Sequence, residues 1–418
     1  MTLERQTIPI REVYAGMYDG PHATPKPSES GPVFLGIKNV GESGQLDLSD
    51  VRHISEEEYP RWIKRVEPRY GDIVFSYEAT LNRYAMIPKG FRGCLGRRMA
   101  LIRPDESKAY GRFLYYYFFG QEWRNVIAQN TLIGSTVDRI PIAKFPDFPI
   151  TIPPFPTQRK IAGILSTYDD LIENNLRRIK ILEEMAQNLY REWFVKFRFP
   201  GHQKVKMVNS PLGKIPEGWE AKRLGDIAED MRRGVNPAQV SPDTPYIGLE
   251  HLPRKSIALS HWGFAGDVQS TKFEFKRGEI LFGKIRPYFH KVGFAPIDGI
   301  CSSDTIVIAA KDLKWYPLLL CCVSSEDFVA HATQTSKGTK MPRADWEVLT
   351  KYPVPVPPPS LLTNFNSFLE NNLGLIENLI LRNHNLCQTR DLLLPKLISG
   401  ELDVSELDIK TTDERLQD

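Results

Sequence analysis

The sequence predicts an α+β protein in which one mixed domain occurs twice and each copy is followed by a long helix. Short β-like runs punctuated by glycine and proline alternate with helical stretches, and two amphipathic stretches are much longer than an ordinary helix. Residues 150–154 return in similar form at 354–358, and the four letters at 171–174 return unchanged at 375–378, both about 204 residues later. A repeat of this length is typical of a duplicated domain.

The repeat extends toward the start of each copy. Its separation rises from about 204 to about 212 residues, and it changes only between matched blocks, as it does when loops lengthen around packed elements. The further matched pairs are Gly134 with Gly338, residues 71–75 with 278–282, Cys94 with Cys301, and residues 34–37 with 246–249. We therefore expect two copies of one fold that carry different loops.

Within each copy the elements are expected in the same order. The β-like runs come first, and in the first copy they cover residues 33–37, 72–76 and 98–102. A helix is expected next, over residues 105–130 in the first copy and 313–335 in the second, because apolar residues recur there at helical spacing. Proline-rich, strand-like segments at 149–156 and 353–359 follow, and their fixed φ angles end the helix before them.

Two long amphipathic helices are expected next, one from residue 157 and one from residue 361, the second ended by Pro395 and then by Gly400. Each would contain about 38 residues and measure roughly 57 Å. Because neither apolar stripe is buried alone, we expect an antiparallel coiled coil with a further apolar face for a partner. Simple capping of the adjacent domain is the alternative. The residues expected to pack in the coiled coil or against a partner are Ile161, Leu165, Leu171, Ile172, Leu182, Leu189, Leu375, Ile376, Leu386 and Leu393.

These elements divide the chain into six segments with a pseudo-twofold internal repeat. The expected segments are a first domain at 1–153, a helix at 154–199, a linker at 200–216, a second domain at 217–356, a helix at 357–398 and a tail at 399–418. Duplex DNA has matching local symmetry, and dimeric DNA-binding proteins use theirs to hold two recognition elements at a fixed separation. Divergence between the copies then indicates that each domain recognises a different half-site.

Composition sets mild limits on function. With 41% hydrophobic and 25% charged residues the chain is ordinary globular protein, and its net charge of +3 is too small to indicate nucleic-acid binding by itself. The five cysteines form no C-x-x-C pair, which favours a reducing cytoplasm over a disulfide framework or zinc cluster. The longest apolar runs are far shorter than the roughly 20 residues that a bilayer requires. We expect a soluble, cytoplasmic protein with no membrane partner.

Positive charge is concentrated locally. Residues 79–104 contain six arginines and lysines and no acidic residue, and the matching stretch of the second copy is also basic until Asp298. Arginine and lysine serve both phosphate contacts and base recognition in DNA. At aligned positions Arg97 matches Asp304 and Arg83 matches His290. The candidate DNA-contacting residues are Arg83, Lys89, Arg92, Arg97, Arg98, Lys284, Arg286, His290 and Lys291, the alternative being that they are solvated loop charges.

The sequence lacks the motifs of a catalytic site. It contains no G-x-x-x-x-G-K-[ST] loop, no G-x-G-x-x-G, no H-E-x-x-H and no Asn-Pro-Pro-Tyr or Asp-Pro-Pro-Tyr of the amino-methyltransferases. The letters at 104–108 resemble a nuclease motif, but they fit the start of a helix better. The aromatic run at 113–119 is expected to fill a core. We therefore expect a noncatalytic protein with no bound cofactor or metal.

Several motifs resemble the specificity (S) subunit of type I restriction-modification systems. They are Pro-Pro-Phe-Pro-Thr-Gln-Arg-Lys-Ile at 153–161, Glu-Trp-Phe at 192–194 and Leu-Pro-Lys-Leu-Ile-Ser-Gly-Glu-Leu at 394–402. The similarity covers essentially the whole chain and recurs in both halves, although the Pro-x-x-x-Gln of the first copy is lost at 359–362. The resemblance implies two target recognition domains, each recognising one part of an asymmetric bipartite DNA site. It also implies that the two helices set the distance between them and bind modification subunits.

The resemblance further implies the partners of the chain. These would be double-stranded DNA, two methyltransferase (modification) subunits and two ATP-dependent restriction subunits, with S-adenosylmethionine, ATP and magnesium bound by the partner subunits. Two alternatives remain: a freestanding duplicated DNA-binding regulator, which should bind DNA tightly alone, and a noncatalytic coiled-coil scaffold, which would lack the basic loops. The DNA sequence recognised does not follow from spacing.

Overall fold

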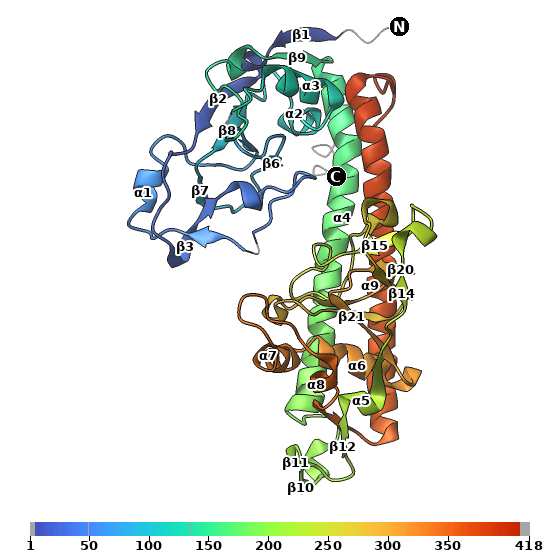
Figure 1. Cartoon of the computed structure of the whole chain (residues 1–418). Coiled ribbons are helices and arrows are strands. Elements are labelled where there is room, and N and C mark those ends of the chain that lie inside the picture. The colour runs from blue at the N-terminus through green and yellow to red at the C-terminus, as the bar shows by residue number, and fades with distance from the viewer. Residues whose placement is uncertain (1–4, 49, 135, 410–418) are drawn as a thin grey trace. The chain divides into compact units, whose positions relative to one another are not determined.

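Two long helices organise the fold, α4 (Phe155–Tyr190) and α9 (Pro359–Ser399), drawn in green and in orange to red in Figure 1. The computed structural model describes residues 5–48, 50–134 and 136–409. They form two compact units, one from the chain up to Asp170 together with the chain from Gln388 onward, the other from Leu171 to Cys387. Each long helix contributes part of its length to each unit, and each unit also contains one mixed α/β domain.

The first domain contains three small sheets. A four-stranded antiparallel sheet has the order β2-β8-β5-β6, formed by β2 (Tyr14–Asp19), β8 (Met99–Pro104), β5 (Ile73–Ser76) and β6 (Tyr84–Met86). A three-stranded sheet has the order β4-β3-β7, formed by β4 (Arg52–His53), β3 (Ser28–Leu35) and β7 (Gly93–Leu95). Its strands β3 and β7 are parallel. A two-stranded sheet pairs β1 (Gln6–Pro9) with β9 (Pro149–Ile152). The helices are α1 (Tyr59–Trp62), α2 (Gly111–Tyr117) and α3 (Gln121–Asn130), with 3₁₀ turns η1 (Ile10–Val13), η2 (Ile37–Asn39) and η3 (Phe145–Asp147).

The second domain repeats this arrangement. Its four-stranded antiparallel sheet has the order β13-β21-β18-β19, formed by β13 (Ala228–Asp230), β21 (Thr305–Ala310), β18 (Ile280–Gly283) and β19 (Val292–Phe294). A five-stranded sheet has the order β14-β17-β20-β15-β16, formed by β14 (Gly234–Val235), β17 (Lys272–Phe275), β20 (Gly299–Cys301), β15 (Pro245–Ile247) and β16 (Gly263–Phe264). One further strand pair joins β12 (Glu220–Arg223), the first strand of this domain, to β22 (Pro353–Val356). The hairpin β10 (Met207–Ser210) with β11 (Gly213–Pro216) precedes the domain, in the segment expected to be a linker.

The second unit also contains short helices and helical turns. They are α5 (Leu224–Ile227), α6 (Tyr316–Val323), α7 (Glu326–Gln334) and α8 (Trp346–Leu349), the π-helical turn η4 (Arg191–Val195), and the 3₁₀ turns η5 (His202–Lys204), η6 (Pro237–Gln239), η7 (Ala265–Asp267), η8 (Pro287–Phe289) and η9 (Leu313–Trp315). Both domains share the four-stranded order, one parallel pair (β3 with β7, β15 with β20) and one pair that joins the first strand to the proline-rich segment. The expected internal repeat of an α+β domain is therefore confirmed.

The helix expected in the middle of each domain is two helices. In the first domain α2 ends at Tyr117 and α3 begins at Gln121, and Gly120 precedes α3 with an extended backbone. In the second, Ser325 separates α6 from α7 and its side chain accepts a hydrogen bond from the Phe328 N–H, which is an N-cap. The single helices expected at 105–130 and 313–335 were wrong because these cap residues lie inside otherwise helical patterns.

The second long helix passes the proline at which it was expected to end. Pro395 lies inside α9, which continues to Ser399 and stops before Gly400 at φ 80°. Leu397 and Ile398 are buried in the core of the first unit. The burial of these two side chains favours one more helical turn although proline removes a hydrogen bond from it.

The two long helices pack antiparallel in each unit, as expected. In the second unit the Asn175 amide donates to the Asn383 Oδ1 at 2.7 Å. The rings of Phe194, in the turn after α4, and Phe365 are 4.7 Å apart. The residue numbers of the contacts therefore decrease along α9 as they increase along the first helix. In the first unit Asp169 of α4 meets Arg390 of α9. Among the residues expected in the packing or partner surface, Ile161, Leu165, Ile172 and Ile376 are buried, Leu182, Leu189, Leu386 and Leu393 are partly buried, and Leu171 and Leu375 are exposed.

The aromatic run after β8 fills the first domain's core, which confirms that expectation. Phe113, Tyr117 and Phe118 are buried, and the Trp123 N–H donates to the Tyr84 hydroxyl at 2.8 Å beside them. Within the parts of the chain that the structure describes, no helix is long and apolar enough to span a bilayer.

Candidate nucleic-acid interface

Three loops meet at one end of the four-stranded sheet of the first domain. They are residues 77–83 between β5 and β6, residues 96–98 before β8, and the described part of 131–140 after α3. The Tyr77 N–H donates to the Arg98 carbonyl at 3.1 Å, and the Ile140 N–H donates to the Tyr77 carbonyl at 2.7 Å. Tyr77 therefore lies between the other two loops. We call this region the first loop junction.

The second domain contains the same construction, which we call the second loop junction. It consists of residues 284–291 between β18 and β19, residues 302–304 before β21, and residues 336–344 after α7. The Lys284 N–H donates to the Asp304 carbonyl at 2.8 Å, and the Ala344 N–H donates to the Lys284 carbonyl at 3.0 Å. A third hydrogen bond also repeats, from Ala79 N to Asp138 O in the first domain (3.0 Å). Its counterpart joins Arg286 N to Pro342 O (2.7 Å).

Backbone strain is concentrated in these junctions. The described residues include seven non-glycine residues at positive φ, and five of them lie here: Ala79, Asn82, Arg98, Arg286 and His290. The left-handed conformation costs a non-glycine residue about 1–2 kcal/mol. Ala79 (φ 72°) and Arg286 (φ 50°) make matching hydrogen bonds, so the strain itself is repeated. Strained backbone persists where surrounding structure holds it and is common at functional sites.

Backbone hydrogen bonds also correct two sequence matches. The Gly96 N–H donates to the Leu35 carbonyl at 2.7 Å, and the Ser302 N–H donates to the Ile247 carbonyl at 3.1 Å in the same place of the second domain. Counting from these two residues, Asp304 corresponds to Arg98 and not to Arg97. In the parallel strand pairs, Leu95 lies beside Leu35 of β3, and Cys301 lies beside Ile247 of β15. Leu95 is therefore the residue that corresponds to Cys301. The expected pairs Arg97 with Asp304 and Cys94 with Cys301 were therefore wrong by one residue.

The match of Arg83 with His290 was also wrong by one residue. The Arg83 carbonyl accepts from Ser76 N at 3.1 Å, as the Lys291 carbonyl accepts from Gly283 N at 2.9 Å. Two loops differ in length between the copies. Residues 77–83 correspond to the longer segment 284–291, and residues 87–92 correspond to the shorter segment 295–298. Between residues 71 and 97 the letters were matched at a single separation of about 207 residues, which could not detect two length changes of opposite sign within that stretch.

The basic candidates of the first domain differ in their surroundings. Arg97 is exposed on its turn, and among the described residues no carboxylate pairs with it. Arg98 Nε lies 3.1 Å from Glu78 Oε1, and Arg83 pairs with Glu42 at 2.5 Å. These three arginines belong to the first loop junction.

Lys89 and Arg92 lie outside that junction. Lys89 Nζ is 5.5 Å from the centre of the Tyr70 ring. Arg92 binds both oxygens of Glu56 at 2.5 Å and stacks 4.8 Å above the Tyr59 ring. That hydrogen bonding lowers the pKa of Glu56 from its ordinary value.

In the second domain two of the four basic candidates are turned inward. His290 is buried, its Nε2 lies 2.8 Å from the Ser324 carbonyl, and burial lowers its pKa, so it is uncharged at neutral pH. Lys291 donates to the Leu249 carbonyl, and burial lowers its pKa as well. Lys284 lies 5.7 Å from the Phe273 ring centre and Arg286 lies 5.9 Å from that of Phe289, both in the second loop junction. Their position favours Lys284 and Arg286 as ligand contacts over the other two.

Sequence reasoning missed an arginine that both junctions share. Arg139 and Arg343 are exposed, and each precedes the residue that donates to the central loop, Ile140 or Ala344. Arg343 Nε is 3.4 Å from Asp304 Oδ1, whereas no ion pair involves Arg139 among the residues described. The separation between Gly134 and Gly338 also relates these two arginines, so the repeat held the signal.

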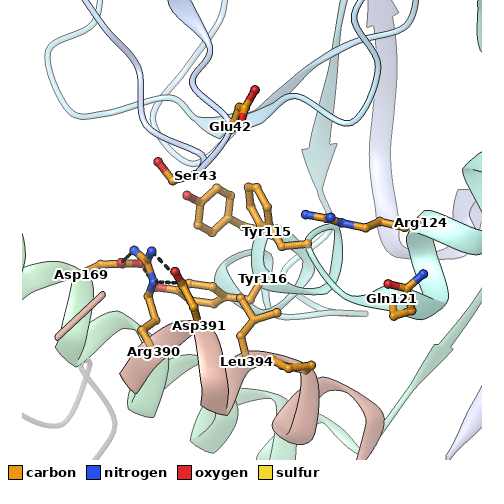
Figure 2. Close-up of a pocket in the computed structure, with 12 residues that line it drawn as sticks. Glu42, Ser43, Tyr115, Tyr116, Gln121, Arg124, Asp169, Arg390, Asp391 and Leu394 are labelled. Carbon is orange, nitrogen blue, oxygen red and sulfur yellow. Dashed lines mark hydrogen bonds and ion pairs between the residues drawn. The ribbon is translucent and has the colours of Figure 1, made fainter. Parts of the chain in front are cut away.

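A second feature fixes the first domain to the helices of its own unit. A cavity of about 370 Å³ is lined by residues of α2, α3, the loop at Glu42 and both long helices. Figure 2 shows the side chains that line it. At its base the Tyr116 hydroxyl donates to Asp169 Oδ2 at 2.5 Å, and Arg390 Nη1 donates to Asp169 Oδ1 at 2.6 Å. Arg390 is 7% exposed and also pairs with Asp391. The buried guanidinium is thus neutralised where the domain meets α4 and α9.

The described residues contain no side-chain cluster suited to a bound metal, and the matched cysteine region holds no ionised thiol. No group of three or more histidine, cysteine or acidic residues among them could hold a metal ion. Burial raises the pKa of the Cys94 and Cys301 thiols to about 12, so both are protonated at neutral pH. What the two domains share is therefore a loop surface that carries charge.

This architecture defines a class: a duplicated α+β recognition protein in which each domain presents a strained, charged loop junction and two antiparallel helices belong to both units. The family model of the type I restriction modification DNA specificity domain matches residues 45–184 and 216–361. The chain belongs to this family and contains two copies of its domain. The resemblance inferred from the sequence is confirmed, and so is the expectation of a noncatalytic, DNA-binding specificity subunit with two target recognition domains.

Relatives and a solved structure agree with this assignment. The chain is 27% identical over 367 residues to the type I restriction enzyme MjaIX specificity subunit of Methanocaldococcus jannaschii, covering 85% of this chain and 83% of that one. It is 26% identical over 334 residues to the type I restriction enzyme EcoDI specificity subunit of Escherichia coli, covering 73% of each. The S subunit of a type I restriction-modification system from M. genitalium has the same fold, with a TM-score of 0.55 at 15% identity over 95% of this chain and 99% of that one.

Proposed function

We propose that this chain recognises an asymmetric bipartite DNA site, one half-site per domain, for a type I restriction-modification complex. The observation that carries the proposal is the loop junction, which occurs twice with the same backbone hydrogen bonds and different side chains. Ala79 in one junction corresponds to Arg286 in the other, and Arg98 corresponds to Asp304. One scaffold with two sets of side chains is what two different half-sites require, because base edges are distinguished by donor and acceptor pattern.

Two modification subunits are the proposed partners of the helices. In the second unit exposed apolar side chains lie on both helices: Leu171, Ile181 and Met185 on α4, and Phe368 and Leu375 on α9. Apolar side chains gathered outside a packed seam favour contact with another protein. Since the repeat gives each helix such a surface, two modification subunits fit, and two restriction subunits would join through them. S-adenosylmethionine, ATP and magnesium would be bound by those partners, in the cytoplasm where host DNA is accessible.

The functional division of the chain follows the repeat. Residues 1–153 and 217–356 are the proposed target recognition domains, and residues 154–199 and 357–398 the spacer helices. Residues 200–216 link the halves, and residues 399–418 form the tail. Each domain would contact DNA through its loop junction, with Arg83, Arg97 and Arg98 in the first and Lys284 and Arg286 in the second.

The test is single-molecule sequencing of methylated bases in host DNA with and without the gene, its partner genes left in place. The expected result is loss of methylation at one asymmetric motif made of two specific parts and a nonspecific spacer. Methylation that is unchanged without the gene would contradict the proposal. If the purified chain alone then bound one DNA sequence tightly, the regulator alternative would replace it.

A further inference from the structure

We propose that the matched position held by Arg98 and Asp304 selects a base in each half-site, and that its reversed charge makes the two domains select opposite base edges. Arg98 would donate to the acceptor edge of a guanine, and Asp304 would accept from the amino group of a cytosine. This inference rests on the proposed function, since it assigns residues to half-sites.

The two side chains occupy the same place in the fold. Both follow a turn that starts on a matched hydrogen bond to the parallel strand, and both directly precede the matched strands β8 and β21. The carbonyl of each accepts from the central loop of its junction, at Tyr77 or Lys284. The matched hydrogen bonds make these two residues correspond, although Arg98 has a left-handed backbone (φ 71°) and Asp304 does not, so the position carries opposite charge in the two domains.

Each side chain is accessible but held. Arg98 and Asp304 are each 34% exposed, and each forms one ion pair inside its junction. The partners differ: Glu78, from the central loop, pairs with Arg98, whereas Arg343, from the third loop, pairs with Asp304. Partly exposed pairs of this kind contribute little net energy and are screened by salt. A base edge can therefore replace the partner, and until then the pair keeps the side chain oriented.

The carboxylate identifies the type of contact. A carboxylate on a DNA-facing surface is repelled by phosphates, so Asp304 does not contact the sugar-phosphate backbone. The base groups that a carboxylate binds are amino groups, and the cytosine N4 amino group is the usual partner of aspartate in the major groove. Arginine in the same place offers two parallel donors that match the O6 and N7 acceptors of guanine.

Conformation argues against a purely structural role for Arg98. Its φ of 71° is unfavourable for arginine, and asparagine or glycine would occupy this turn with less strain. The hydrogen bond at this turn uses the backbone carbonyl, which any residue supplies. The ion pair to Glu78 alone is too weak to compensate for the strain, since left-handed geometry costs more than such a pair contributes.

The experiment uses the complete complex in its host, with the chain replaced by variants and the methylated motif sequenced. Arg98→Asn keeps the turn but removes the charge, and preference for guanine at one position of one half-site should fall about tenfold or more. Asp304→Asn keeps the shape but adds donors, and one position of the other half-site should lose its cytosine preference. Lys108→Ala is the matched control, because it removes an exposed positive charge of the same domain beyond the opposite end of β8, and the motif should not change.

The unaltered half-site shows in every variant that the complex is folded and active. If the Arg98→Asn complex is unstable by thermal melting, Arg98→Lys replaces it, and a partial loss of guanine preference is then expected because lysine lacks the paired donors. An unchanged motif in both variants, or changes in both half-sites from one substitution, would overturn the inference while the proposed function stands. Absence of any bipartite motif with the unaltered chain would instead refute the proposed function, and the inference with it.

Discussion

At the scale of single residues, the loop junctions separate side chains that differ between the copies from one that does not. Arg98 and Asp304 differ, whereas Arg139 and Arg343 are identical, exposed and carried on matched backbone. A contact that is needed in both domains whatever the sequence is a contact to phosphate. We therefore expect the shared arginines to contribute affinity and not specificity.

Arg139→Ala should weaken DNA binding by the complex about equally for cognate and unrelated sequences. One lost phosphate contact should reduce the slope of log affinity against log salt by about one. The control is Lys108→Ala, which removes the same charge beyond the opposite end of β8. Titrating labelled cognate and unrelated DNA at several salt concentrations measures this slope. A changed preference between DNA sequences with an unchanged slope would indicate that Arg139 contacts a base.

His290 gives a prediction about pH. Burial lowers its pKa in the folded state, so the unfolded chain binds the proton more readily, and stability that is present at pH 7 is lost as pH falls below the ordinary value of about 6.5. His290→Asn tolerates the φ of 53° and has no charge to gain. The unfolding temperature of this variant should fall less between pH 7 and pH 5 than that of the unaltered chain. An equal fall in both would show that other groups, such as His261 and His384, whose pKa values desolvation also lowers, account for the acid sensitivity.

The residue scale is also where sequence reasoning was least sufficient. Clusters of arginine and lysine in glycine-rich loops correctly indicated which loops carry charge. The direction of each side chain depends on the packing around it, as the inward positions of His290 and Lys291 show. The register of the repeat was missed by one residue at Arg97 because loop-length changes of opposite sign nearly cancel.

At the scale of elements, the helix pair contains one buried polar contact that the repeat does not duplicate. Asn175 and Asn383 are buried and hydrogen-bonded across the seam. The repeat relates them to Leu379 and Ile179, both buried and apolar in the same core. A single buried asparagine pair in a coiled coil costs stability and favours one register over its alternatives. We infer that this pair fixes how the two helices align in the second unit.

Replacing one partner of this pair should cost more than replacing both. Asn175→Leu leaves the Asn383 Oδ1 buried without its donor, which should lower the free energy of unfolding by about 1–3 kcal/mol. Adding Asn383→Ile reproduces the apolar contact of the repeat and should recover most of that loss. Denaturant unfolding of both single variants and the double variant gives the coupling energy. Additive effects would mean that the two amides act independently.

Helices were predicted correctly where a periodic pattern extends over many turns. The prediction failed where a single cap or a few buried residues determine where a helix ends. The periodic stripes of α4 and α9 extend over many turns, so their existence and antiparallel packing could be predicted. The break between α2 and α3 depends on Gly120, and the last turn of α9 depends on burial of Leu397 and Ile398. Neither a cap nor a tertiary contact has a periodic signature in the sequence.

At the scale of the whole molecule, the two copies share the order of their elements but differ in the side chains that join each domain to the long helices. The Tyr116, Asp169 and Arg390 network ties the first domain to the helices of its unit, and in the second unit the repeat places the buried apolar residues Leu373 and Ala186 at the positions of Asp169 and Arg390. Each domain is therefore held by contacts of its own kind. A domain exchanged for one from a relative should keep function only if its helix contacts match.

The helices themselves provide the last prediction, because the proposed function makes them set the spacer between half-sites. Inserting seven residues into α4 after Asp170 and seven into α9 after Cys387 keeps the apolar period and the antiparallel pairing, since Asp169 faces Arg390 and Asn175 faces Asn383. The added length of about 10.5 Å corresponds to roughly three base pairs at 3.4 Å each. The methylated motif should keep both specific parts and lengthen its spacer by about three. Insertion into α4 alone disrupts the seam and should abolish methylation, whereas an unchanged spacer in the double insertion would mean that the helices do not set it.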